Sequence, residues 1–282
     1  MLVTRFAPSP SGRLHRGHAF SALTAQALAH RSGGRLILRI EDIDTARSRP
    51  AFEAAILDDL AWLGLEWEAP VRRQSEHLTD YTDALQRLHA EGLVYRCFKT
   101  RREILDDIGR APHEREAPYA GAALPKREEA ARLAAGEPFA WRLSLAAARQ
   151  RLGAAWAALS FVEQGAGPNG EHGEQQARPE RAGDVILARK DLGVAYHLAV
   201  VVDDALQAIT HVARGCDLFE AVHLQRLLQA LLGLPTPVYH HHRLLLRPDG
   251  KRFAKRDQAE TLDQLRAQGM SAQALRAELG FG

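Results

Sequence analysis

Two histidines bracket a glycine near the start of the chain, where a Pro/Ser/Gly-rich turn (residues 7–12) gives way to a helical pattern. His15 and His18 can each donate a ring N–H to a phosphate oxygen, and Gly17 leaves room for a nucleotide to approach. A helix N-terminus also attracts anions, because its first backbone N–H groups are unpaired and carry partial positive charge. The cluster predicts a nucleotide-phosphate site, although two ordinary surface histidines would give the same tetrapeptide.

A second cluster, Gly-Lys-Arg-Phe-Ala-Lys-Arg, occupies residues 250–256. The ammonium group of Lys255 could stabilise the negative charge that develops when a carboxylate displaces pyrophosphate from ATP. Gly250 would allow this loop to move during the reaction. Taken alone, the segment is better explained as a solvated basic loop, so its assignment depends on the first cluster.

The elements around the first cluster indicate a βαβ unit. A strand is expected over residues 1–6, a helix over 19–31 and a second strand over 35–40. A right-handed crossover makes such strands parallel, so we expect an α/β fold with a Rossmann-type parallel sheet. Further helices are expected over residues 50–63, 81–91 and 218–232, and further sheet strands over 184–188 and 198–203.

The pattern of elements also suggests a division of the chain. An inserted α+β subdomain separates two halves of the Rossmann domain, and a small helical C-terminal region carries the basic loop. The boundaries predicted are 1–95 and 183–235 for the two halves, 96–182 for the insertion and 236–282 for the helical region.

Composition limits the class of protein. The chain has 282 residues and a formal net charge of +2, which is too small to indicate nucleic-acid binding by itself. No apolar run approaches the roughly 20 residues of a membrane helix, and no signal-peptide pattern precedes the first strand. The two cysteines, Cys97 and Cys216, do not form a disulfide framework. We expect a cytoplasmic enzyme that has no membrane partner.

Both clusters resemble signatures of a known family. Residues 5–18, Arg-Phe-Ala-Pro-Ser-Pro-Ser-Gly-Arg-Leu-His-Arg-Gly-His, resemble the first signature of class I aminoacyl-tRNA synthetases, in the form typical of the glutamyl-tRNA synthetase subclass. Residues 250–256 resemble the second signature, with Ala254 and Arg256 where the family usually has serine. The resemblance covers nearly the whole chain and includes residues 38–48, 183–187, 193–204 and 209–218.

The resemblance implies an enzyme that activates L-glutamate with ATP, and it implies particular site residues. The implied catalytic residues are His15, His18 and Lys255, which with Gly17 also bind ATP. The implied glutamate-binding residues are Arg5, Phe6, Ala7, Pro8, Ser9, Glu41, Tyr196 and Arg214.

The chemistry of a dicarboxylic amino acid suits this set. The planar guanidinium groups of Arg5 and Arg214 can each bind a carboxylate through two hydrogen bonds, and Glu41 can accept hydrogen bonds from the α-ammonium group. Ser9 can add a neutral hydrogen bond. Glutamine would leave part of a guanidinium unmatched, so we expect selectivity for the acid. A structural ion pair of either arginine, or a solvated Glu41 carboxylate, is the alternative.

No structural metal site is expected, whereas Mg²⁺ should accompany ATP. Relatives often carry zinc in the insertion, but the equivalent positions here are Cys97, Lys99, Tyr119 and Ala123, which do not make a tetrahedral zinc site. The run at 240–242 is three histidines. Adjacent side chains of an extended chain point to opposite faces, so this run is interpreted as scaffold.

The chain stops soon after the second signature, whereas full glutamyl-tRNA synthetases continue into an anticodon-binding domain that we do not expect here. It resembles the truncated branch that transfers glutamate to the cyclopentenediol of queuosine, at the wobble position of tRNA(Asp), after activation without tRNA. The anticodon loop bearing queuosine would be the RNA partner of a monomer. Candidates for phosphate contact are Arg101, Arg102, Arg127 and Arg132, although a solvated helix face explains them equally well.

Two alternatives stay open at this point. One is a minimal glutamyl-tRNA synthetase that charges the 3′ end of a tRNA. The other is a nucleotide- or tRNA-binding regulator without catalysis, for which the missing serine of the second signature is the only support.

Overall fold

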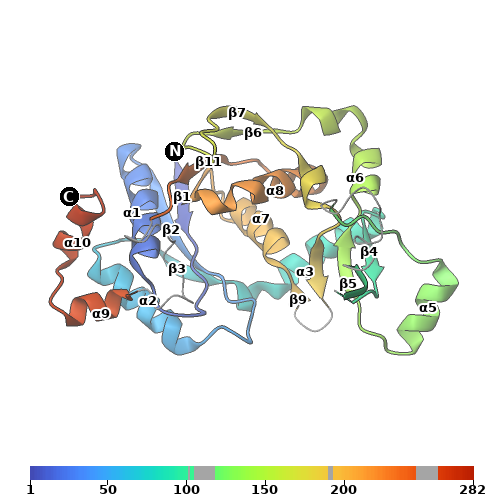
Figure 1. The fold of residues 1–282 in the computed structure, drawn as a ribbon, viewed down its shortest axis with the longest axis horizontal. Coiled ribbons are helices and arrows are strands. Elements are labelled where there is room, and N and C mark those ends of the chain that lie inside the picture. Colours follow the sequence, from blue (N-terminus) through green and yellow to red (C-terminus); the bar gives the residue numbers. More distant parts are fainter. Residues whose placement is uncertain (101, 105–117, 190–192, 246–259) are drawn as a thin grey trace.

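The computed structural model describes residues 1–100, 102–104, 118–189, 193–245 and 260–282 (Figure 1). The chain begins with strand β1 (Val3–Phe6), helix α1 (Arg16–Arg31) and strand β2 (Arg35–Ile40). Since β1 and β2 pair in parallel, the expected βαβ unit is confirmed. Helix α1 starts earlier than predicted, because the His15 side chain caps its N-terminus.

The central sheet consists of two groups of strands that meet at β1. One group has the order β3-β2-β1 and the other β10-β11-β6-β7, and the antiparallel β6–β7 pair is the exception in an otherwise parallel arrangement. The Thr210 N–H donates to the Val3 carbonyl over 2.9 Å, so β10 lies beside β1. The remaining bounds are β3 (Glu68–Arg73), β6 (Ser160–Glu163), β7 (Gly173–Gln176), β10 (His211–Gly215) and β11 (Val238–His242). The predicted α/β class with a Rossmann-type sheet is confirmed.

Helices cover both faces of this sheet. Alternate strand residues point to opposite sides, so Ile37 and Val212 enter one hydrophobic core and Leu38 and Ala213 enter the other. The first core also contains α3, α7 and α8, and the second contains α1 and α2. The bounds of these helices are α2 (Pro50–Trp62), α3 (Leu78–Ala90), α7 (Tyr196–Leu206) and α8 (Phe219–Leu232).

The strand predicted over residues 198–203 is wrong, because this segment lies within helix α7. Three consecutive valines favour a strand locally, and a short apolar run does not reveal its period. Residues 198–204 are all buried, and α7 packs against α3 and α8. Burial on all sides therefore outweighs the weak local preference for a strand.

A second, antiparallel sheet has the order β4-β5-β8-β9 and lies at the opposite end of the molecule from the C-terminus (Figure 1). Its strand β8 corresponds to the strand predicted over residues 184–188. In contrast, β6 and β7 belong to the central sheet although they come from the segment assigned to the insertion. The domain boundaries stay a prediction. The bounds here are β4 (Val94–Cys97), α5 (Lys126–Ala134), β5 (Ala140–Leu143), α6 (Leu145–Leu152), β8 (Ile186–Arg189) and β9 (Gly193–Val194).

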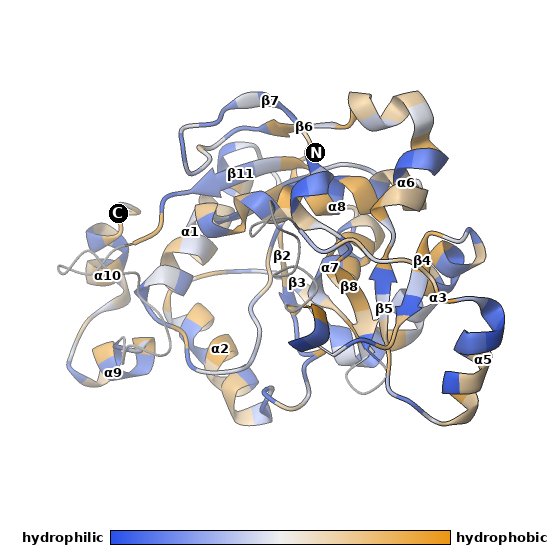
Figure 2. Ribbon diagram, turned by 45° about the vertical axis from the view of Figure 1, so that its right-hand side comes forward, coloured by the Kyte–Doolittle hydropathy of each residue, from blue (hydrophilic) through white to orange (hydrophobic). Residues whose placement is uncertain are grey.

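Two short helices, α9 (Leu262–Ala267) and α10 (Ala272–Glu278), lie in the C-terminal region predicted to be helical. The beginning of that region, at 238–242, is instead strand β11 of the central sheet, because it pairs with β10. Apolar and polar stretches alternate within each of them (Figure 2). Leu262, Leu265 and Leu275 enter the same core as α1 and α2, which fixes this region against the central sheet. Among the described helices, none is long and apolar enough to cross a membrane.

Candidate active site

The carboxyl ends of β1 and β10 open onto a cavity of about 450 Å³. Ligands of open α/β sheets bind at this edge, because the connecting loops leave a crevice there. All eight residues implied for glutamate binding line the cavity: Arg5, Phe6, Ala7, Pro8, Ser9, Glu41, Tyr196 and Arg214. The structure therefore brings together side chains from four separate segments of the sequence.

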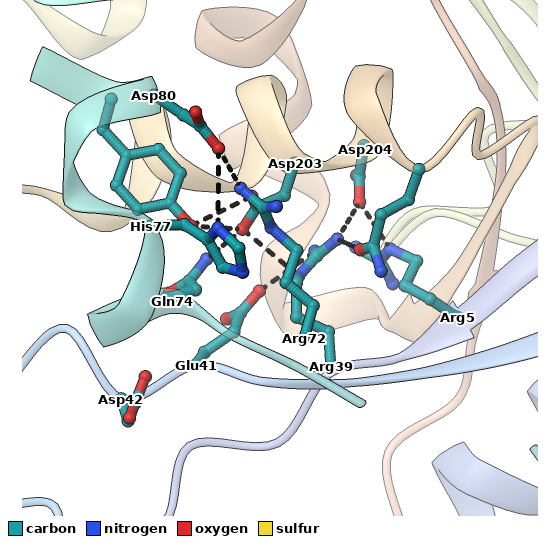
Figure 3. Close-up of polar contacts among 12 residues, drawn as sticks. Arg5, Arg39, Glu41, Asp42, Arg72, Gln74, His77, Asp80, Asp203 and Asp204 are labelled. Carbon is teal, nitrogen blue, oxygen red and sulfur yellow. Dashed lines mark hydrogen bonds and ion pairs between the residues drawn. The ribbon is translucent and has the colours of Figure 1, made fainter. Parts of the chain in front are cut away.

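Arg5 and Glu41 are joined through two buried residues (Figure 3). Asp204 of α7 accepts from Arg5 Nε over 3.1 Å and forms an ion pair with Arg39 Nη1 at 2.9 Å. Arg39 Nη2 in turn donates to Glu41 Oε1 over 3.1 Å. Because Arg39 is completely buried, these contacts fix the two cavity-lining groups relative to each other.

The charges of this network balance. Burial alone would lower the pKa of Arg39, but Asp204, Glu41 and Asp203 raise it above its usual value, so the guanidinium stays charged. Burial would raise the pKa of Asp204, but Arg5 and Arg39 hold it below its usual value. For Glu41, burial outweighs the two arginines and the pKa is raised. A substrate ammonium group would stabilise the ionised form of Glu41.

Asp203, the neighbour of Asp204, also belongs to this network, because its carboxylate lies 3.6 Å from Arg39 Nε. It accepts hydrogen bonds from Tyr81 Oη (2.9 Å), Gln74 Nε2 (2.8 Å) and Arg72 Nε (2.8 Å), and it is completely buried. A buried carboxylate with three donors is well compensated, so α7 is held firmly against β3 and α3.

Arg214 of β10 also lines the cavity. Its Nε donates to His241 Nε2 over 3.1 Å and its Nη1 to Tyr196 Oη over 3.4 Å. Its Nη2 is buried and has no hydrogen-bond partner in the structure. Since an unpaired buried donor is costly, this nitrogen is suited to a ligand carboxylate.

A second cavity of about 420 Å³, lined by His15, Gly17 and His18, adjoins the first and shares His18 with it. His15 Nδ1 accepts the Gly17 N–H over 3.1 Å, and His18 Nδ1 accepts the His15 N–H over 3.2 Å. Each neutral ring must therefore carry its proton on Nε2, the donor that it can offer to a phosphate. A side chain on Gly17 would place its Cβ 3.0 Å from the His15 ring, so glycine keeps this cap intact.

Lys255 lies outside the described residues, so its position relative to these cavities is not described. The chain on either side of that segment is next to the second cavity. Residues 242–245 line it, and the Leu262 N–H donates to the Leu14 carbonyl over 2.9 Å, directly before His15.

Of the four positions considered for a zinc site, Cys97 is the last residue of β4. Cys97 is buried with its Sγ 3.9 Å from Tyr119 Oη, and neither Lys99 nor Ala123 supplies a thiolate. Across the described ranges, no group of three or more His, Cys, Asp or Glu side chains could hold a metal ion. The histidine run at 240–242 alternates in burial along β11, with His241 facing the core.

The arginines proposed to contact RNA differ in their surroundings. Arg102 and Arg127 are exposed, whereas Arg132 pairs with Glu128 one helical turn away over 3.0 Å. This pairing favours a solvated helix face for Arg132. Arg101 lies outside the described residues.

Reasoning from the sequence did not single out Arg39 or Asp204 as site residues. The available signals were a cation inside an otherwise apolar strand and two consecutive aspartates after an apolar run. Both patterns indicate buried charges that need partners, but neither identifies the partner.

Comparison with known proteins identifies the family of the chain. The family of tRNA synthetases class I (E and Q), catalytic domain, matches residues 1–156 and 166–281. A glutamyl-Q tRNA(Asp) synthetase of Rhodobacter capsulatus is 47% identical over 99% of this chain and 100% of that protein. One from Symbiobacterium thermophilum is 43% identical over 100% of this chain and 86% of that protein.

Solved structures point the same way. A glutamate tRNA ligase from Elizabethkingia meningosepticum, determined in complex with its amino acid, superimposes with a TM-score of 0.71 at 29% identity. The match covers 91% of this chain and 52% of that ligase, so the chain spans about half of its length. A methionyl-tRNA synthetase from Mycobacterium tuberculosis, at 15% identity and a TM-score of 0.61, shares the fold.

A Rossmann-type sheet with paired histidines at its carboxyl edge defines the class I tRNA synthetase architecture. The chain belongs to the class I tRNA synthetase (E and Q) family, whose similar members include the glutamyl-Q tRNA(Asp) synthetases.

Proposed function

We propose that this enzyme activates L-glutamate with ATP without tRNA, and then transfers glutamate to the cyclopentenediol of queuosine at the wobble position of tRNA(Asp). The observation that carries the proposal is the pair of adjoining cavities. One is lined by two guanidinium groups and a carboxylate, and the other by the two histidines of the α1 capping box. Relatives that match nearly the whole chain carry the name of this activity.

In the first step, an α-carboxylate oxygen of glutamate attacks the α-phosphorus of ATP and the bond to pyrophosphate breaks. Arg5 and Arg214 bind the carboxylate groups of glutamate, and Glu41 accepts hydrogen bonds from its α-ammonium group. His15 and His18 donate Nε2–H groups to the phosphates, and Lys255 neutralises the departing charge. Positioning and electrostatic stabilisation supply the acceleration, since the protein forms no covalent bond.

Mg²⁺ would enter with ATP and neutralise part of its phosphate charge. The described lining of the nucleotide cavity offers one carboxylate, Asp217, and three histidine rings. Such a donor set fits a cation held mainly by phosphate oxygens and water, as Mg²⁺ usually is. No structural zinc is proposed, because the residues near β4 do not supply the ligands.

In the second step, a hydroxyl oxygen of the acceptor attacks the acyl carbon, AMP leaves and the hydroxyl proton is released. A third cavity of about 320 Å³ shares Ser9, Glu41 and Tyr196 with the glutamate cavity and offers space for the acceptor. A queuosine diol is proposed rather than a tRNA 3′ end because the relatives that match nearly the whole chain are named glutamyl-Q tRNA(Asp) synthetases. We also propose that the protein is a cytoplasmic monomer and that it binds the anticodon loop of tRNA(Asp).

Glutamate-dependent exchange of labelled pyrophosphate into ATP, measured without tRNA, tests the first step. Exchange that requires glutamate and is not supported by glutamine is expected. Labelled glutamate is then incubated with ATP and tRNA(Asp) with or without queuosine, and the label is mapped by nuclease digestion. Label at the 3′ end would favour a minimal glutamyl-tRNA synthetase, and ATP binding without exchange would favour a regulator.

A further inference from the structure

Arg214 is held by two buried side chains that the mechanism above does not use. Its Nε–H donates to His241 Nε2 over 3.1 Å, and His241 Nδ1 lies 2.5 Å from Glu163 Oε2. The three residues come from the adjacent strands β10, β11 and β6, and Arg214 and His241 are direct partners in the β10–β11 register. Their exposed fractions are 5% for Arg214, 1% for His241 and 0% for Glu163. The chain Glu163–His241–Arg214 therefore runs from the protein interior to the glutamate cavity.

The hydrogen bonds fix the protonation state of the ring. An arginine Nε–H can only donate, so His241 Nε2 must carry a lone pair and Nδ1 must carry the proton. The Nδ1–H group of His241 donates a hydrogen bond to Glu163 Oε2. Glu163 Oε1 accepts the backbone N–H groups of His241 (2.8 Å) and Gly165 (2.7 Å). His241 is thus a neutral imidazole between a carboxylate and a guanidinium.

The surroundings favour these states. Burial lowers the pKa of His241 and outweighs the hydrogen bond to Glu163, which would raise it, and the charge of Arg214 lowers it further. Burial would raise the pKa of Glu163, but the hydrogen bonds from the His241 ring and backbone lower it. In the described part of the chain, the rings of Phe219 and Tyr239 also lie against the His241 ring and carry no charge, and the neighbouring His240 lowers the pKa of His241 further.

Arg214 therefore differs from Arg5 in its charge balance. Arg5 is hydrogen-bonded directly to the Asp204 carboxylate. Arg214 is instead hydrogen-bonded to the neutral His241 ring, and the Glu163 carboxylate lies on the far side of that ring. Within the described part of the chain, no carboxylate forms an ion pair with Arg214. Its buried Nη2 also lacks a hydrogen-bond partner.

The backbone that follows Glu163 packs closely against the backbone of His241. A Cβ on Gly165 would lie 2.0 Å from the His241 carbonyl oxygen, and the Ala166 N–H donates to that oxygen over 3.0 Å. Gly165 and Ala166 therefore pack directly on β11, and the Gly165 N–H helps to hold the Glu163 carboxylate against His241.

We propose that Glu163 and His241 are positioning residues that orient Arg214 while leaving its positive charge for a substrate carboxylate, and so set the preference for glutamate over its amide. This inference rests on the proposed function, because it assigns a specificity role within the same cavity. Neither residue is proposed to touch the reacting atoms.

Two substitutions of His241 separate positioning from structure. His241→Gln places an amide oxygen near the former Nε2 and can still accept from Arg214, whereas His241→Asn places its amide near Nδ1 and cannot. The Michaelis constants for glutamate and ATP are measured by pyrophosphate exchange, together with the thermal unfolding temperature. His240→Asn, on the other side of β11, is the matched control.

The expected result is a rise of the glutamate KM by about tenfold or more in His241→Asn, the loss typical of one hydrogen bond to a charged group. The glutamate KM of His241→Gln and His240→Asn stays within about threefold of the wild type, since the Arg214 contact persists. The ATP KM is unchanged throughout, and the ratio of glutamate to glutamine exchange falls only in His241→Asn.

Glu163→Gln tests the same chain if His241→Asn does not fold. The new amide N–H would donate to His241 Nδ1, so the ring proton would move to Nε2 and oppose the Arg214 N–H. The glutamate KM should then rise as in His241→Asn. Equal glutamate KM values in His241→Asn and His241→Gln, or a parallel change in the ATP KM, would overturn the inference. A wild-type protein without glutamate-dependent exchange would instead overturn the proposed function.

Discussion

Arg5 Nε lies 3.1 Å from Asp204 Oδ1, and the same oxygen lies 2.9 Å from Arg39 Nη1. One buried carboxylate thus serves two guanidinium groups, of which Arg5 lines the glutamate cavity and Arg39 is wholly enclosed. Arg39 extends the network to Glu41. The distance between the groups proposed to bind the carboxylate and the ammonium of glutamate is therefore set by Asp204.

Replacing Asp204 by asparagine should weaken both the fold and substrate binding. Removing one partner of a buried ion pair leaves uncompensated charge, and a loss on the order of 3 kcal/mol in the free energy of unfolding is expected. The glutamate KM should rise by about tenfold or more as Arg5 loses its orientation. Urea denaturation and pyrophosphate exchange measure the two effects. Asp58→Asn, at an exposed position of α2, is the control. Wild-type values for both quantities would contradict this role of Asp204.

Two variants of His15 should separate its capping role from its catalytic role. Asparagine is a good N-cap residue and can accept the Gly17 N–H, whereas alanine cannot. His15→Ala should therefore lose about 1 kcal/mol of stability and His15→Asn should keep it. Both should lower kcat for exchange, because both lack the Nε2–H donor. Retention of full kcat in His15→Asn would show that the ring does not act on ATP.

Asp59 of α2 should make stability depend on pH. It is fully buried, its carboxylate oxygens have no hydrogen-bond partner, and Arg266 Nη2 is 3.7 Å away. Burial raises the pKa of Asp59 to about 6. A raised acid pKa means that the folded state binds the extra proton, so this residue lowers stability as pH rises from about 4 to 6.

Asp59→Asn, which cannot ionise, should remove that pH dependence. The difference in Tm between the variant and the wild type should become more positive from pH 4 to pH 7, by roughly 2–5 °C. Thermal denaturation followed by circular dichroism at both pH values provides the measurement. A difference that does not vary with pH would mean that Asp59 keeps an ordinary pKa in the folded protein.

The site near β4 should not require zinc. The purified protein should contain well under one zinc atom per chain by mass spectrometry. Treatment with a zinc-selective chelator, followed by excess Mg²⁺, should leave the exchange rate intact. Cys97→Ser should behave in the same way, because its Sγ faces the Tyr119 hydroxyl. One tightly bound zinc per chain, lost together with activity, would refute this prediction.

Local features of the site could be predicted from the sequence. The histidine cluster and its helix follow from contacts within four residues, such as the His15 cap on Gly17 and the His18 bond to the His15 N–H. The β2 strand was predicted with its observed bounds for a similar reason, since a mostly apolar run between glycines and acidic residues, interrupted by Arg39, indicates a buried strand. Resemblance to the family then named the cavity-lining residues.

The sequence alone determined the chemical groups available: two arginines for a diacid, a carboxylate for an ammonium, and imidazoles at a helix N-terminus for phosphate. The tertiary structure decided how they are held. Asp204 reaches Arg5 because the valine-rich run before it forms a buried helix, and Glu163 reaches His241 because β6 pairs with β11 in the central sheet. Both choices depend on burial and pairing between segments far apart in the chain, energies that no local pattern encodes.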